Sequence, residues 1–195
     1  MQTKTGTPLT THAPRRRPRP RLLALLVAVG VSGYALDQGT KAWAVAGLEP
    51  GVRRSLVGSL LQLNLTRNAG AAFSMATNAT WLLTLIAIVV IGVTVFAARR
   101  LGSVGWAAAL GLLLAGACGN LTDRFVRAPG GGQGHVVDFL ELPHWPIFNV
   151  ADMCVVTAAA LIALLAVRGV SLDGTRASND TDAPGSKGAG ETDEQ

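Results

Sequence analysis

The sequence predicts an all-α membrane protein, in which four transmembrane helices carry a small extracytoplasmic β-sheet and loop packed on the outer face. Of its 195 residues, 49% are hydrophobic and only 15% are charged, whereas a soluble domain carries about 25% charged residues. Four long apolar runs separate the charged segments, and each approaches the roughly 20 residues that a membrane span requires. Between the first two runs, leucines alternate with polar residues over 61–66, which is the period of a strand with one apolar face.

The first apolar run follows a polar segment, residues 1–21, in which we expect a disordered basic cytoplasmic tail. The run Leu22–Leu36 is only 15 residues long, so the first helix is expected to continue to about Trp43. A basic flank before a short apolar run is also typical of a signal peptide, but no small-x-small cleavage site follows. The helix then carries Asp37 and Lys41 near its far end, where their i, i+4 spacing lets them pair.

Three further apolar runs are predicted to cross the membrane: Trp81–Ala98, Val104–Leu121 and about Phe148 to Val167. With the first helix they define one membrane domain over 22–168, whose outer loops cover 44–79 and 122–147. Residues 169–195 are rich in Ser, Thr, Asp, Gly and Glu, and we expect a disordered cytoplasmic tail there.

The charged and metal-ligating residues exclude several classes of function. The net charge of +5 does not indicate a nucleic-acid partner, because six of the 17 basic residues precede the first apolar run, as a topology signal does. Cys118 and Cys154 both lie in apolar segments and are expected to be buried without forming a disulfide framework. No metal-ligand spacing is present, and we expect neither a metal nor another cofactor.

The distribution of basic residues predicts the orientation. With the N-terminus inside, the cytoplasmic side holds 11 of the 17 Lys and Arg residues and the outer side holds six. The positive-inside rule therefore favours two cytoplasmic termini and two outer loops.

In this topology the membrane-level polar residues gather at the outer ends of the four helices and in the two outer loops. Asp152 lies about four residues into the last helix, roughly 6 Å deep at 1.5 Å per residue. An ionisable side chain there indicates function, although an interfacial Asp favoured by the helix dipole is the simpler alternative. One polar site at the outer interface explains the whole set: Asp37, Lys41, Asn68, Asn120, Asp123, Arg124, Asp138, Asn149 and Asp152.

Two of these carboxylates suit peptide hydrolysis. Carboxylates held close together share one proton, so that one activates water while the other donates to the carbonyl oxygen, without a metal or a covalent intermediate. Asp138 lies in an apolar Val-Val-Asp-Phe segment, which raises its pKa, and we predict that it acts with Asp152. Asp37 and Asp123 have cations one turn away, Lys41 and Arg127, and suit an orienting role, although Asp123 remains the alternative partner in the dyad.

Three other functions fit these residues less well. A Ser–Lys catalyst would use Ser74 and Lys41, but pairing with Asp37 keeps Lys41 charged and a poor base. A proton-coupled transporter would use Asp152 as its carrier, yet transporter sites lie near the membrane midplane, where these spans have no ionisable residue. A non-enzymatic scaffold has no need of polar clusters on one side.

Five motifs in order resemble the lipoprotein signal peptidases, the signal peptidase II family, over roughly 22–168. They are Asp37-Gln38-Gly39-Thr40-Lys41, Asn68-Ala69-Gly70-Ala71-Ala72-Phe73, Gly119-Asn120-Leu121-Thr122-Asp123-Arg124, Val136-Val137-Asp138-Phe139 and Phe148-Asn149-Val150-Ala151-Asp152. The Gly-rich segment 128–134 is similar to a slightly long insertion before the fourth motif.

The resemblance implies an aspartic endopeptidase of the bacterial cell membrane with its active site at the outer face. Its substrates would be diacylglyceryl-modified prolipoproteins, cut on the N-terminal side of the lipidated cysteine, with membrane lipid as a further partner and globomycin as the expected inhibitor. Asp138 and Asp152 match the family's catalytic pair. The substrate-binding set that we expect is Asp37, Lys41, Asn68, Gly70, Asn120, Asp123, Arg124, Asn149 and Ala151.

Overall fold

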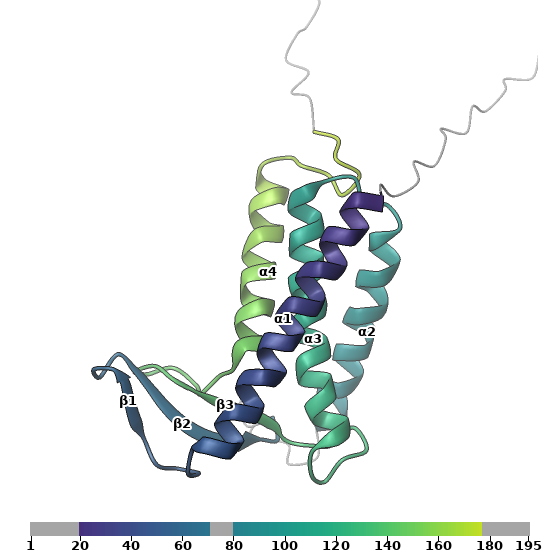
Figure 1. Cartoon of the computed structure of the whole chain (residues 1–195). Helices are drawn as coiled ribbons and strands as arrows, with labels where there is room; N and C mark the ends of the chain where they lie inside the picture. Colours follow the sequence, from purple (N-terminus) through teal and green to yellow (C-terminus); the bar gives the residue numbers. More distant parts are fainter. Residues whose placement is uncertain (1–19, 71–79, 177–195) are drawn as a thin grey trace, which may run out of the picture.

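Four helices and a three-stranded sheet make up the part of the chain that the structure, a computed structural model, describes: residues 20–70 and 80–176. Most of the two predicted tails and the segment 71–79, which includes Ser74, lie outside the described residues. The helices stand side by side and the sheet lies at one end of the bundle (Figure 1). The first residues of α1 and the last residues of α4 lie at the opposite end (Figure 1).

The four helices are each long and apolar enough to cross a membrane, which confirms the predicted spans. They are α1 (Pro20–Gly47), α2 (Thr80–Ala98), α3 (Val104–Val126) and α4 (Val150–Val167). Two of them run further than predicted: α1 passes Trp43 and α3 passes Leu121. Hydropathy underestimates both because each carries charged side chains near its end. Asp37 and Lys41 of α1 and Asp123 of α3 are buried against one another.

Helix α3 is the centre of the bundle, since it packs against each of the other three helices. Small residues bring the backbones together along this seam. A Cβ at Gly33 of α1 would lie 2.8 Å from the Cβ of Ala115, and one at Gly116 would lie 2.6 Å from Cγ2 of Val155 in α4. Real Cβ atoms do not approach so closely, so glycine at these positions sets the distance between helices.

The sheet is antiparallel, in the order β1 (Arg54–Val57), β2 (Leu61–Asn68) and β3 (Val136–Glu141). Strand β2 confirms the strand predicted over 61–66. The expected alternation fails in one place, because Asn64 is buried between Leu63 and Leu65 and donates to Oε2 of Glu141 at 2.8 Å. The β2–β3 register shifts between Leu63 and Thr66, and such a bulge breaks the period of two.

The sheet packs on the end of α1, which explains why this helix continues beyond the expected span. Ala44 of α1 and Leu48 form a buried cluster with Leu63 and Leu65 of β2 and Val137 and Phe139 of β3. Residues Val136 to Phe139 are all buried, so Asp138 lies in a covered strand and not in the loop that the sequence suggested. The strand carries Asp138 to the same end of the bundle as the start of α4.

Candidate functional site

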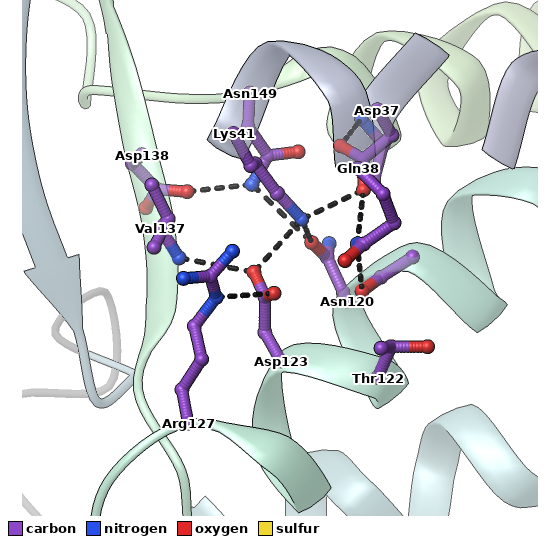
Figure 2. A network of polar contacts seen from close by, with 12 residues as sticks. Asp37, Gln38, Lys41, Asn120, Thr122, Asp123, Arg127, Val137, Asp138 and Asn149 are labelled. Atoms are coloured by element: carbon purple, nitrogen blue, oxygen red, sulfur yellow. Dashed lines mark hydrogen bonds and ion pairs between the residues drawn. The ribbon is translucent and has the colours of Figure 1, made fainter. Parts of the chain in front are cut away.

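The predicted polar residues converge at the sheet end of the bundle. Figure 2 shows side chains from α1, α3, strand β3 and the start of α4 pointing toward one another, with Lys41 in the middle of the network. The interactions fall into two linked parts, one around Asp138 and Asp152 and one around Lys41.

Asn149 begins α4 and fixes the position of Asp152. Its side-chain oxygen accepts from the backbone N–H of Asp152 at 3.0 Å, and Oδ2 of Asp152 accepts from the backbone N–H of Asn149 at 3.2 Å. This reciprocal pair is a capping box, which satisfies two N–H groups that a helix start leaves free. Asp152 is therefore the third residue of the helix, one position nearer its start than predicted.

Asp138 is 2% exposed and accepts two hydrogen bonds from side-chain amides. Nδ2 of Asn149 donates to its Oδ1 at 2.6 Å, and Nδ2 of Asn68 donates to its Oδ2 at 2.9 Å. Burial raises the pKa of Asp138 to about 6, and the nearby Asp152 charge adds to the rise, while the two amide hydrogen bonds oppose it. A carboxyl group with such a pKa exchanges its proton near neutral pH, as an acid–base catalyst must.

Two asparagines join the carboxylates. Asn120 donates to Oδ1 of Asp152 at 2.8 Å and accepts at its own Oδ1 from Nδ2 of Asn149 at 3.2 Å. Asn149 thus donates from its side-chain amide to Asp138. It binds Asp152 twice, through its own backbone N–H and through the side-chain oxygen that caps the helix. Asp152 is only half-buried, so the two acids share one hydrogen-bond network while their environments differ.

Lys41 is the centre of the second part. Its Nζ lies 2.9 Å from Oδ2 of Asp37, 3.0 Å from Oδ2 of Asp123 and 3.0 Å from Oδ1 of Asn120. The Asp37–Lys41 pair confirms the interaction predicted from their spacing, whereas the pair with Asp123 was not predicted. The side chains of Lys41, Asp37 and Asp123 are 0%, 0% and 1% exposed, so the three charges are buried together.

The two carboxylates that bind Lys41 also bind backbone amides. Oδ1 of Asp37 accepts from the N–H of Ala151 at 2.8 Å, and Oδ2 of Asp123 accepts from the N–H of Val137 at 3.1 Å. Oδ1 of Asp123 pairs with Nε of Arg127 at 2.7 Å, as the spacing of these residues predicted. Each carboxylate oxygen of the pair therefore has a donor.

Arg124 and Gly70 complete the predicted set. One terminal nitrogen of Arg124 donates to the backbone oxygen of Asn120 at 3.1 Å, while its buried Nε has no hydrogen-bond partner among the described residues. The Gly70 N–H donates to Oδ1 of Asn68 at 2.8 Å, and its φ of +110° suits glycine. Sequence reasoning missed Gln38, which donates to Oδ2 of Asp37 at 3.0 Å and to the backbone oxygen of Gly119 at 3.1 Å.

The arrangement supports acid–base chemistry. Within residues 20–70 and 80–176, no group of three or more His, Cys, Asp or Glu side chains forms a metal-binding cluster.

An apolar groove of about 430 Å³ runs along α1 and α3 from Leu26 to Tyr34 and Thr122. The Tyr34 hydroxyl lies 3.2 Å from that of Thr122, so the groove ends in polar groups one residue from Asp123.

Known proteins are similar to this chain in sequence and in architecture. The family model described as signal peptidase (SPase) II matches residues 29–168. A lipoprotein signal peptidase of Rhodococcus jostii (strain RHA1) is 55% identical over 157 residues, which make up 80% of this chain and 78% of that protein. One of Mycobacterium avium (strain 104) is 50% identical over 166 residues, covering 85% and 91%. A solved bacterial membrane enzyme matches with a TM-score of 0.67 at 25% identity, over 74% of this chain and 94% of its own.

Proposed function

The chain belongs to the signal peptidase II family, and from that premise we propose that it is an aspartic endopeptidase of diacylglyceryl-modified prolipoproteins. It removes the signal peptide by cutting on the N-terminal side of the lipidated cysteine. The observation that carries the aspartic mechanism is the position of Asn149, whose side chain binds Asp138 and caps the helix turn that carries Asp152.

Asp138 and Asp152 act as a dyad that holds one proton between them. The ionised carboxylate takes a proton from water as the water oxygen attacks the scissile carbonyl carbon, and the protonated carboxyl donates to the carbonyl oxygen. When the tetrahedral intermediate collapses, the C–N bond breaks and the cysteine nitrogen takes the proton that the first carboxylate had removed from water. A hydroxyl of the intermediate returns its proton to the other carboxylate, so that a new carboxyl terminus forms and the dyad again holds one proton. The amides of Asn68, Asn120 and Asn149 hold the two acids in place throughout.

The substrate lies against the exposed side of this dyad. Arg124 suits a contact with a peptide carbonyl, because its buried Nε still has a free N–H among the described residues. The predicted lining residues Asn68, Gly70, Asn120, Asn149 and Ala151 all lie in or next to the hydrogen bonds of the dyad. The groove along α1 and α3 suits an acyl chain, since apolar side chains line most of it, and globomycin is expected to compete at the same site.

We place the sheet and the dyad at the outer face of the bacterial cell membrane. The bundle begins and ends at the side opposite the sheet (Figure 1). In the topology predicted from the sequence, the tails and the loop on that side hold 11 of the 17 basic residues, as cytoplasmic segments do. Both termini are then cytoplasmic. The scissile bond of a signal peptide lies where its helix leaves the bilayer, which matches a shallow Asp152.

The test is incubation of the purified protein in detergent with a diacylglyceryl-modified prolipoprotein. Asp138→Asn and Asp152→Asn should each abolish cleavage with expression intact, while Asp173→Asn, at the opposite end of the bundle, should cleave normally. Near-normal turnover by Asp138→Asn, together with an inactive Asp123→Asn, would move the dyad to Asp123. Equal cleavage of an unmodified precursor would remove the lipid requirement.

A further inference from the structure

Each aspartate of the dyad follows a residue whose backbone N–H is held by a buried carboxylate. Ala151 precedes Asp152 and donates to Asp37 at 2.8 Å. Val137 precedes Asp138 and donates to Asp123 at 3.1 Å. The chain segments that carry the two catalytic carboxyl groups are therefore each attached to a helix that does not carry the dyad.

One ammonium group joins these two attachments. Nζ of Lys41 lies 2.9 Å from Oδ2 of Asp37 and 3.0 Å from Oδ2 of Asp123, and the dashed lines around it in Figure 2 show both contacts. Its third contact, at 3.0 Å, is Oδ1 of Asn120, whose amide donates to Asp152. The three N–H groups of the ammonium thus connect α1 with two points on α3.

We propose that Lys41 is a positioning residue that joins Asp37 to Asp123 and thereby sets the separation of the Asp138 and Asp152 carboxyl groups. Asp152 and Asp138 lie in different elements, at the start of α4 and in strand β3. The links through Ala151 and Val137 connect both elements to the same cation. This role rests on the dyad proposed above.

Stability alone does not account for the triad of Asp37, Lys41 and Asp123. Replacing a buried ion pair by apolar side chains is often neutral or stabilising, because desolvation of the charges offsets their attraction. Contact with substrate does not account for it either, since each carboxylate oxygen and the ammonium group already have partners within the protein. Catalysis does require such rigidity, because a misplacement of about 1 Å can lower a rate about 10²-fold.

The experiment removes the cross-link without leaving a buried charge alone. Asp37→Asn and Asp123→Asn each keep an amide oxygen for the backbone N–H and leave Lys41 one carboxylate. Lys41→Met is made only in the triple variant with both Asn substitutions, because alone it would leave two buried carboxylates without their cation. Trp106→Phe is the matched control, since it deletes one hydrogen bond, from Trp106 to the backbone oxygen of Val170, in the half of the bundle away from the dyad.

Turnover of the diacylglyceryl-modified prolipoprotein and thermal unfolding in detergent are measured for each variant. The folded triple variant should lose about 10²-fold in kcat with KM unchanged. Each single variant should have a lower kcat than the wild type. The kcat of the triple variant should be no lower than that of the less active single variant, because all three variants break the same link. Trp106→Phe should lower the melting temperature without lowering kcat.

Wild-type kcat in the folded triple variant would overturn the proposal. A raised KM with unchanged kcat would also overturn it, because the triad would then contact substrate. If the triple variant does not fold, the single variants decide: a loss of kcat at constant KM in both supports the role, and normal kcat in either contradicts it. Turnover by Asp138→Asn or Asp152→Asn would instead refute the dyad itself, whatever the triad variants do.

Discussion

Asp138→Asn should abolish a pH dependence of stability that the wild-type protein shows between about pH 4 and pH 6. Burial raises the pKa of Asp138 from 3.8 to about 6, so the folded protein binds this proton more tightly than the unfolded chain does. As the pH rises through this window, the buried carboxyl ionises and stability falls. A difference of about two pKa units at 1.36 kcal/mol each gives a loss of about 3 kcal/mol, or about 6–12 °C in melting temperature for a protein of this size.

The assay is thermal unfolding of both proteins in one detergent at a series of pH values from 4 to 7. The melting temperature of the wild type should fall relative to that of Asp138→Asn as the pH rises. Asp152→Asn is the matched control, because it removes the charge that adds to the rise in the Asp138 pKa, so the pH dependence should shrink but persist. A constant difference between wild type and Asp138→Asn from pH 4 to pH 7 would refute the assignment of a raised pKa to this residue.

Substitutions at Asn149 and Gly119 test how the site is held. Asn149→Ser keeps an oxygen cap on α4 and Asn149→Ala does not, so the Ala variant should be the less stable of the two by about 1 kcal/mol. Both remove an amide donor that lowers the pKa of Asp138, so the alkaline limb of the pH–rate profile, where the dyad loses its shared proton, should move to higher pH; an unmoved limb in Asn149→Ser would contradict this. Gly119→Ala places a methyl group against the Asp37 carboxylate and should cost about 1–3 kcal/mol as well as activity. Gly39→Ala, with nothing within 4 Å, should retain wild-type stability, and equal melting temperatures for the two Ala variants would exclude the clash.

The elements with a regular hydrophobic pattern were predictable from the sequence. The apolar runs predicted the four spans, and the alternation over 61–66 predicted β2. Strand β3 has no alternation, because both of its faces are buried over Val136–Phe139, and such a strand reads as a continuous apolar run. Strand β1 is exposed throughout and leaves no burial pattern to read.

The candidate site was predictable as a set of residues but not as a network. Spacing on one helix predicted the Asp37–Lys41 and Asp123–Arg127 pairs, since i, i+4 neighbours share a face. The contact of Lys41 with Asp123 depends on how α1 and α3 are rotated about their axes, which the seam of small residues decides. The donors to Asp138 come from β2 and from the residue before α4, and only the tertiary structure brings these together.

Asp152 and Asp138 lie in elements that differ in their contact with the surrounding lipid. Helix α4 has 18 residues and is about 27 Å long, slightly shorter than a hydrocarbon layer of about 30 Å, whereas β3 lies beyond the helices and packs on the end of α1. A thicker or thinner bilayer acts on α4 directly, by changing its tilt or depth, and acts on β3 only through the helices against which the sheet packs. Under the dyad proposed above, membrane thickness would change the separation of Asp138 and Asp152, and the proposed link through Lys41 would oppose that change.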